Sequence, residues 1–129
     1  NSSVAYGGGF YVNNAADKNL SIVIQDNEFR DNVAHHGGGI QLNDSDAAVI
    51  QNNLFYQNHA ITISDGGGIH VGMGVNPVSI FENTFSENTA DHNGGAILVD
   101  SGSVANISNC IVWGNITAMG GPIHEIGGS

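Results

Sequence analysis

Histidine and carboxylate side chains gather just ahead of the glycine runs in this sequence. If successive segments of the chain stack on one another, three of these side chains come to one edge: His36, Asp65 and His92. Imidazole and carboxylate groups together suit a transition-metal ion. The sequence therefore offers a candidate metal site, and the alternative is that these are ordinary turn residues. The Asp-rich bend at residues 43–46 carries oxygen ligands of the kind that bind Ca²⁺.

Two acidic residues are candidates for chemistry on a glycosidic bond. Asp31 and Glu87 occupy the same position in two units of a repeat, and Gln57 holds that position in the unit between them. A glycoside hydrolase needs two carboxylates at a defined separation, and two stacking intervals would give about 9.6 Å, which an inverting enzyme tolerates. Acidic residues are also common at exposed bends, and we favour that interpretation.

The charge balance of the chain restricts its partners. Lys18 and Arg30 are the only basic residues, against 12 acidic residues and a formal net charge of −10. A lyase for acidic polysaccharides would need cations to hold its substrate, and two isolated ones make a poor site. The same balance argues against nucleic acid and against anionic lipid surfaces. No apolar run is long enough to span a bilayer, so membrane insertion is not expected.

These candidate sites depend on a repeat that runs through the chain. The pattern I-x-x-N-x-F-x-x-N begins at Ile24, Ile50, Ile80 and Ile107; the last copy has Cys110 in place of the first asparagine and Val112 in place of phenylalanine. A second pattern, a glycine pair or triplet followed closely by a large apolar residue, ends at Phe10, Ile40, Ile69, Ile97 and Ile123. Units of roughly 26–30 residues cannot bury their own apolar faces, so each must stack on the next.

Alternation of apolar and polar residues, as in Ile40-Gln41-Leu42, predicts strands, and helical spacing is absent. We therefore predict an all-β fold, a parallel β-solenoid of about four to five coils. It forms one domain over residues 1–129, which we interpret as a piece of a longer solenoid. Stacking in register predicts four inward apolar columns: Ile24, Ile50, Ile80 and Ile107; Phe29, Phe55, Phe85 and Val112; Phe10, Ile40, Ile69, Ile97 and Ile123; Val12, Leu42, Val71 and Val99.

Two polar columns interrupt the predicted interior. One contains Asn32, Asn58, Asn88 and Asn115, and the other contains Asn27, Asn53 and Asn83 and ends in Cys110. An asparagine at a bend can bond both the turning backbone and the asparagine stacked beside it. We predict structural asparagine ladders, with a ligand-binding row as the alternative. Cys110 is the single cysteine, so it has no internal disulfide partner, and we expect a small buried hydrophobe.

The outward positions offer a candidate binding surface. The column one step after the phenylalanines reads Arg30, Tyr56, Ser86 and Trp113. Exposed aromatic rings at such spacing could stack on sugar rings or on a protein partner, and the alternative is that Trp113 packs beneath a neighbouring loop or chain. A second outward column, with mixed chemistry, reads Tyr11, Gln41, His70, Leu98 and His124.

The glycine and asparagine patterns together resemble those of a known family. Gly94-Gly95-Ala96-Ile97 and the F-x-x-N segments that begin at Phe29, Phe55 and Phe85 are similar to the repeats of polymorphic outer-membrane proteins, which are autotransporter adhesins. The chain also resembles the wider family of right-handed parallel β-helix proteins, including pectate-lyase-like enzymes. The resemblance implies a right-handed coil. It implies little about activity, because one scaffold can carry different functions.

We therefore expect a secreted or cell-surface module that is structural or adhesive and has no catalytic activity of its own. Its partner would be a glycan or a host or cell-surface protein. Two alternatives stay open: a carbohydrate-binding or polysaccharide-active module, and a subunit that stacks end to end with its own copies into an extracellular filament. No cofactor is expected, apart from the Ca²⁺ or transition-metal ion considered above. Abundant glycine and asparagine with little lysine favours an extracellular location.

Overall fold

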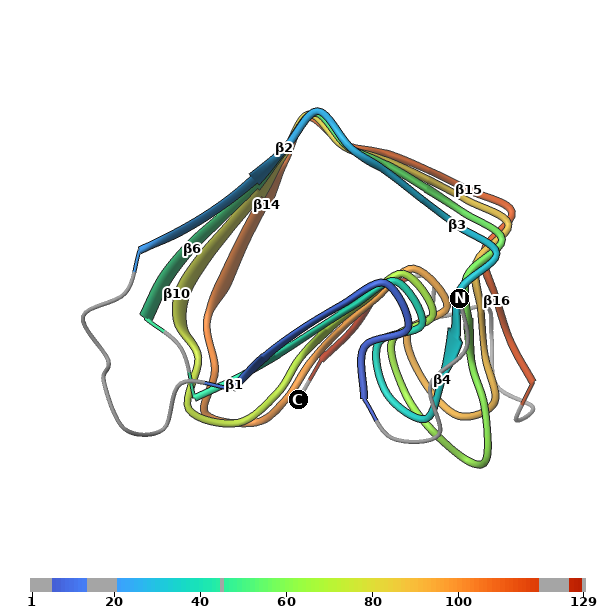
Figure 1. Cartoon of the computed structure of the whole chain (residues 1–129). Coiled ribbons are helices and arrows are strands. Elements are labelled where there is room, and N and C mark those ends of the chain that lie inside the picture. The colour runs from blue at the N-terminus through green and yellow to red at the C-terminus, as the bar shows by residue number, and fades with distance from the viewer. Residues whose placement is uncertain (1–5, 14–20, 45, 119–125, 129) are drawn as a thin grey trace.

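The chain winds into a parallel β-solenoid in which equivalent segments of successive coils lie over one another (Figure 1). The computed structural model describes residues 6–13, 21–44, 46–118 and 126–128. Within these ranges every regular element is a strand. None is a helix long and apolar enough to cross a bilayer.

In the described part of the chain, four parallel sheets form the walls of the solenoid, and we number them in chain order. The strands of sheet I are β1 (Phe10–Asn13), β5 (Ile40–Asn43), β9 (Ile69–Val71), β13 (Ile97–Val99) and β17 (Ile126–Gly128). The strands of sheet II are β2 (Ile22–Gln25), β6 (Asp46–Gln51), β10 (Asn76–Phe81) and β14 (Ala105–Ser108).

The remaining two sheets have shorter strands. Sheet III contains β3 (Glu28–Arg30), β7 (Leu54–Tyr56), β11 (Thr84–Ser86) and β15 (Ile111–Trp113). Sheet IV contains β4 (Val33–Ala34), β8 (His59–Ala60), β12 (Thr89–Ala90) and β16 (Ile116–Thr117). Each coil therefore crosses sheets II, III and IV and returns through sheet I (Figure 1).

The phenylalanines form a single file, as predicted. Phe29 is the register partner of Phe55, and Phe55 of Phe85, across parallel strands of sheet III. Their ring centroids are 5.0 and 4.7 Å apart, with ring planes within 7° of parallel. Val112 continues the column beside Phe85. Phenylalanine rings on adjacent strands lie one strand spacing apart and can stack on one another. This stacking explains why phenylalanine recurs at the same position of the repeat.

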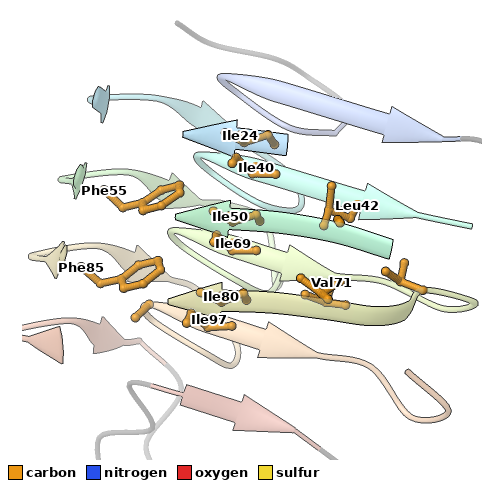
Figure 2. Close-up of a cluster of buried hydrophobic side chains, with 14 residues drawn as sticks. Ile24, Ile40, Leu42, Ile50, Phe55, Ile69, Val71, Ile80, Phe85 and Ile97 are labelled. Atoms are coloured by element: carbon orange, nitrogen blue, oxygen red, sulfur yellow. The ribbon is translucent and has the colours of Figure 1, made fainter. Parts of the chain in front are cut away.

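The isoleucine column is also confirmed, since Ile24, Ile50, Ile80 and Ile107 are successive register partners in sheet II. Side chains from sheets I, II and III meet inside the coil (Figure 2). Fully buried members of this core include Ile40, Leu42, Ile50, Phe55, Ile69, Val71, Ile80, Phe85 and Ile97. Stacking thus buries the apolar faces that a single unit would leave in water.

Both asparagine ladders are present. Asn32 donates to Asn58 at 2.8 Å, Asn58 to Asn88 at 2.9 Å and Asn88 to Asn115 at 2.8 Å, each through side-chain amides. The other ladder runs from Asn27 through Asn53 to Asn83. Cys110 replaces the next amide, and its Sγ lies 3.3 Å from the carbonyl oxygen of Ser108.

The residue just before each ladder position turns the chain with a left-handed backbone. Its φ lies between 51° and 59° in the first set, Asp26, Asn52, Glu82 and Asn109, and between 52° and 67° in the second, Asp31, Gln57, Glu87 and Gly114. Non-glycine residues rarely adopt this conformation. The ladder amides bond carbonyl oxygens at these bends, as Asn83 does with Phe81 at 3.0 Å, and so help to hold the turns.

The glycine runs form the tight corner that leads into sheet I. Gly37 has φ +58°, and a Cβ there would lie 2.1 Å from the carbonyl oxygen of Ile40. At Gly38 the limit is close approach: a Cβ would lie 2.4 Å from the carbonyl oxygen of Gly67 on the next coil. Only glycine allows both conditions in successive residues.

The prediction that Ile123 enters sheet I after the final glycine pair is wrong. The partner of Ile97 in sheet I is Ile126 and not Ile123, and Leu98 pairs with Gly127 and not with His124. The segment 119–125, which contains the predicted Gly120-Gly121-Pro122-Ile123 copy, lies outside the described residues. The sequence Ile126-Gly127-Gly128 itself enters the sheet, so the strand begins three residues later than the motif indicates.

Candidate functional site

The predicted binding column lies on the outer face of sheet III. Arg30, Tyr56, Ser86 and Trp113 are successive register partners. The guanidinium carbon of Arg30 lies 5.5 Å from the centre of the Tyr56 ring, which is cation–π distance. Arg30 is also held by the carboxylates of Glu28 at 3.2 Å and Asp31 at 3.3 Å. The basic end of this column is therefore anchored by three contacts.

Trp113 forms the apolar end of the column. It is 66% exposed, and Ile111 on the same strand is 64% exposed. Within the described residues, the alternative that a neighbouring loop covers Trp113 does not hold. Ser86, between Trp113 and Tyr56, has a small side chain, so the two rings are two strand spacings apart, about 9.6 Å, with a gap between them.

The bend beside this column carries the predicted carboxylate pair. The backbone bonds Asp31 to Tyr56, Gln57 to Ser86 and Glu87 to Trp113 have the same geometry, so Asp31, Gln57 and Glu87 share one register as expected. Gln57 Nε2 donates to Glu87 Oε2 at 2.9 Å, and Asp31 is paired with Arg30. Each carboxylate therefore already has a partner on its own surface.

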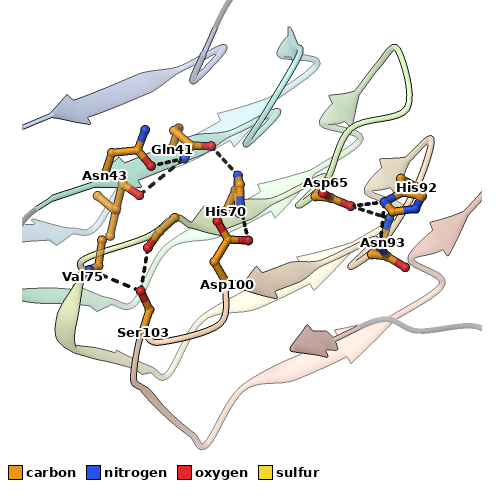
Figure 3. A network of polar contacts seen from close by, with 11 residues as sticks. Gln41, Asn43, Asp65, His70, Val75, His92, Asn93, Asp100 and Ser103 are labelled. Atoms are coloured by element: carbon orange, nitrogen blue, oxygen red, sulfur yellow. Dashed lines mark hydrogen bonds and ion pairs between the residues drawn. The ribbon is translucent and has the colours of Figure 1, made fainter. Parts of the chain in front are cut away.

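Asp65 and His92, two of the three predicted metal ligands, are in contact. His92 Nδ1 lies 2.9 Å from Asp65 Oδ1, and the same oxygen accepts the backbone N–H of Asn93 at 2.9 Å (Figure 3). A carboxylate in this position orients an imidazole ring. Asp65 and His92 each lie just before the glycine corner of their own coil, as the sequence indicates.

His36, the third predicted ligand, lies in a stack of rings instead. Its ring is 5.7 Å from that of Tyr6 and 5.2 Å from that of His70, and Tyr6 stacks on Tyr11 at 5.3 Å. No group of three His, Cys, Asp or Glu side chains in the described ranges could hold a metal ion. The three-ligand site expected from sequence is therefore not assembled there, because the ring of His36 packs against Tyr6 and His70.

The environment of His36 affects its protonation. Burial lowers the pKa of His36 below its usual 6.5, and the nearby His70 acts in the same direction, whereas Asp65 and Asp100 oppose the shift. Its Nδ1 atom is buried without a hydrogen-bond partner among the described residues. Burial without a partner favours the neutral ring.

His70 anchors a polar network that the sequence did not indicate. Its Nδ1 lies 2.7 Å from Gln41 Oε1 and its Nε2 lies 3.0 Å from Asp100 Oδ1 (Figure 3). Gln41 in turn donates to Asn43 Oδ1 at 2.7 Å. Gln41 and His70 belong to the second column predicted to face outward, but they are only 1% and 5% exposed. The column is therefore buried at these two positions. The connection between β4 and β5 curls back and sets His36 against it.

A further histidine–carboxylate pair lies near sheet IV. His59 Nε2 is 2.9 Å from Asp91 Oδ1, and the other oxygen of Asp91 accepts the backbone N–H of Thr62 at 2.7 Å. The hydrogen bond from His59 is the main reason that the pKa of Asp91 lies below 3.8; burial opposes the shift. This pair fixes the connection that follows β8.

Residues 1–126 match the sequence profile of a family described as the right-handed β-helix region. The chain belongs to the right-handed β-helix family. The right-handed coil expected from resemblance is thereby confirmed. No curated protein and no solved structure matches the chain.

Membership in the β-helix family establishes the scaffold and leaves the activity open. The repeat pattern of this β-helix located the Trp113 column and the Asp65–His92 pair. It missed Asp100, which comes directly after β13 and reaches back one coil to His70. Lys18, the other basic residue considered, lies outside the described ranges, as does part of the bend at 43–46.

Proposed function

We propose that this β-helix is a secreted or cell-surface adhesive module that binds a glycan on the outer face of sheet III and has no catalytic activity of its own. The observation that carries the proposal is the exposed Trp113, in register with Tyr56 across the small Ser86. Flat aromatic faces in one file, separated by a gap, suit the apolar faces of successive sugar rings.

The polar groups beside this column support a sugar ligand over a purely apolar one. Gln57 and Glu87 form an exposed hydrogen-bonded pair at the adjoining bend, and Arg30 lies at the far end of the column. The Gln57 amide can donate to and accept from hydroxyls, the Glu87 carboxylate accepts from them, and the Arg30 guanidinium donates to them. Because the column stands on a rigid sheet, its spacing is set by the backbone before the ligand arrives.

The adhesive and extracellular parts of the proposal rest on the sequence. The Gly-Gly-Ala-Ile and F-x-x-N tetrapeptides are similar to those of polymorphic outer-membrane adhesins, and the composition is rich in glycine and poor in lysine. End-to-end stacking of copies is a separate prediction. Light scattering over a range of concentrations tests it, and a strict monomer would exclude it.

A polysaccharide-active module is the second candidate. The shared register of Asp31 and Glu87 favours it, since two coil spacings of about 9.6 Å leave room for a water molecule between carboxylates. Both groups are already paired, Asp31 with Arg30 and Glu87 with Gln57. We therefore place binding ahead of turnover.

A glycan array followed by fluorescence titration tests the proposal. Trp113 is the single tryptophan of the chain, so its emission reports directly on the proposed face. We expect the glycan selected on the array to change that emission in the wild-type protein. Isothermal titration calorimetry compares the variants, since Trp113→Ala has no tryptophan, and Trp113→Ala should weaken binding roughly three- to tenfold. The matched control is Val23→Ala, an exposed apolar residue of sheet II, which should leave affinity unchanged.

Two outcomes would overturn the proposal. One is a glycan that binds wild type and Trp113→Ala equally well, because the site would then lie elsewhere. The other is cleavage of a glycan that is lost in Glu87→Gln, because this would favour the polysaccharide-active alternative.

A further inference from the structure

The outer face of sheet III is uneven along β11. Thr84 and Ser86 point out of the coil there, on either side of the buried Phe85, and both side chains are small. Their register partners on the two neighbouring strands are larger: Leu54 and Tyr56 in β7, and Ile111 and Trp113 in β15. We call Thr84 and Ser86 the β11 strip. It is a floor of hydroxyl groups between two walls of apolar and aromatic side chains.

A hollow of about 450 Å³ continues one end of the β11 strip. Leu54 and Thr84 line it, and it extends from them over the bend between sheets II and III, where Glu82 lies. The exposed pair of Gln57 and Glu87 stands at the opposite end of the strip, at the bend between sheets III and IV. A chain molecule that enters the strip therefore has room to continue past its first end.

The inner face of the same sheet gives the width of the gap between Tyr56 and Trp113. There Phe55 lies between Phe29 and Phe85, with ring centroids 5.0 and 4.7 Å away and ring planes within 7° of parallel. Rings that are two strands apart thus leave room for one ring between them. Tyr56 and Trp113 are also two strands apart, but the middle strand carries a serine at this position. The gap therefore has the width of one ring.

The Tyr56 ring has one face covered and the other turned to this gap. The guanidinium carbon of Arg30 lies 5.5 Å from the ring centre and comes from β3, on the side away from β11. The opposite face of the ring is on the β11 side. Trp113 on the far side of the gap is 66% exposed. A ligand ring above Ser86 would complete a stack between the two aromatic side chains.

Charges around the β11 strip favour an uncharged ligand. None of the six side chains of the strip and its walls is charged, and Glu82 and Glu87 lie at its two ends. Arg30 is the one Lys or Arg within the described ranges, and it is held by the carboxylates of Glu28 and Asp31. An acidic ligand would meet like charges and find no free cation, which is costly.

The floor of the strip favours a sugar ring over an aromatic ring. The hydroxyls of Thr84 and Ser86 can each donate and accept a hydrogen bond. A sugar ring that stands between Tyr56 and Trp113 presents hydroxyls at its edge to this floor, whereas an aromatic hydrocarbon presents only C–H groups. Apolar ring faces between aromatic walls and hydroxyls on a hydroxyl floor are the combination that a neutral sugar offers.

We propose that the β11 strip holds an uncharged segment of a glycan, with one sugar ring inserted between Tyr56 and Trp113 and its hydroxyl edge on Ser86. The next sugar lies over Thr84, and the chain continues into the hollow. The glycan therefore runs along β11, across the coils. This inference rests on the proposed glycan binding and adds to it the charge of the glycan and its direction.

Trp113 emission of the wild-type protein tests the charge of the glycan. The neutral probes are cellotetraose and fully methyl-esterified tetragalacturonate, and their acidic matches are cellotetraose oxidised at its primary alcohols and free tetragalacturonate. We expect a saturable change with at least one neutral probe and binding of its acidic match that is weaker by about tenfold or more. An acidic match that binds as tightly overturns the inference and leaves glycan binding standing. No response to any of the four also overturns it, while the glycan array separately decides the proposed function.

Ser86→Phe tests the position of the sugar ring. The new ring fills the gap as Phe55 does on the inner face, so we expect binding of the neutral probe to be lost. Ser79→Phe is the matched control, because Ser79 is half-buried on the outer face of sheet II in the same coil, and it should bind as wild type does. Both variants keep Trp113, so its emission reports on each.

The sign of the Ser86→Phe effect separates this inference from the proposed function. If the sugar rings lay along the outside of the aromatic file, an added ring would lengthen the file and strengthen binding. Unchanged or tighter binding by Ser86→Phe therefore overturns the inference alone, and so does an equal loss in Ser79→Phe. Circular dichroism checks that the variants are folded. If Ser86→Phe does not fold, Ser86→Leu, which fills the gap with a smaller side chain, decides by the same criterion.

Discussion

Asn58 donates two hydrogen bonds to the side-chain oxygen of Asn88, one from its backbone N–H at 3.0 Å and one from its side-chain amide at 2.9 Å. Asn88 in turn donates to the carbonyl oxygen of Phe55 and to Asn115 at 2.9 and 2.8 Å. One amide therefore joins three successive coils and satisfies a buried bend. All of these groups are out of contact with water, so the ladder is stable only when it is complete.

Replacing Asn88 with alanine should consequently be strongly destabilising. The change leaves the N–H groups of Asn58 and the carbonyl oxygen of Phe55 without their partner, and each buried unsatisfied group costs about 1–3 kcal/mol. We expect a loss of about 3 kcal/mol or more in the free energy of unfolding, measured by urea titration. Asn27→Ala is the control at the exposed end of the other ladder and should cost about 1 kcal/mol or less. Equal losses would mean that the ladder does not act through burial.

The phenylalanine file gives a second test of stacking. Phe55 is fully buried between Phe29 and Phe85, whereas Phe29 is only partly buried. Phe55→Ala removes one ring from the middle of the file and leaves a cavity, so we expect a loss of about 3–5 kcal/mol. Phe29→Ala should cost clearly less, because its side chain already contacts solvent. Urea titrations of the two variants against wild type provide the comparison, and a larger loss at Phe29 would contradict the observed packing.

The sequence could predict these columns because each is a repeated choice of one residue type at one register. It could not place the last coil, since the glycine pattern points to Ile123, which follows Gly120 and Gly121, whereas Ile126, which follows no glycine pair, is the residue that pairs with Ile97. The burial of Gln41 and His70 was missed for a different reason. Strand alternation correctly points these side chains out of the coil, but what covers them depends on how the connection to β5 folds back. His36 stacks on His70 from that connection, and no periodic signal encodes such a contact.

In the candidate sites, too, the contacts between register partners could be predicted from the repeat, and the contacts made by connecting segments could not. Register alone brings Arg30 beside Tyr56 and leaves Trp113 at the end of the file. The contact between Asp65 and His92 also follows from adjacent coils. The His70–Asp100 contact forms only because the chain turns directly after β13. That turn lies in a segment that does not repeat, so the repeat pattern could not predict the contact.

The corner glycines allow a test of close approach without a change in backbone preference. Gly38 has no left-handed backbone, but a Cβ there would lie 2.4 Å from the carbonyl oxygen of Gly67 and 2.7 Å from the backbone nitrogen of His59. Because both neighbours are backbone atoms of the next coil, Gly67 at its glycine corner and His59 in β8, they cannot move aside cheaply. We expect Gly38→Ala to cost about 1–3 kcal/mol or more in thermal or urea unfolding. Ser86→Ala on the outer face of sheet III is the control, and a Gly38→Ala variant as stable as wild type would show that the coils can separate there.

The last prediction concerns pH. The pKa of His36 lies below 6.5 in the folded protein because the ring is buried, whereas the unfolded chain titrates near 6.5. As the pH falls below 6.5, the unfolded state therefore takes up a proton that the folded state does not, and stability decreases. The charged and titratable groups around the ring are His35, Asp65, His70 and Asp100. Asp91 contributes in a separate window, below 3.8, where the loss of its ionised form removes the stabilising bond from His59.

His36→Phe keeps a ring in the stack between Tyr6 and His70 and removes the titration. We expect the free energy of unfolding of wild type to fall more steeply between pH 7 and pH 5 than that of His36→Phe, measured by urea titration at fixed ionic strength. Val23→Ala, an exposed residue of sheet II with no titratable group, is the control and should retain the wild-type slope. Parallel curves for wild type and His36→Phe would show that His36 is not the group that makes the fold sensitive in this range.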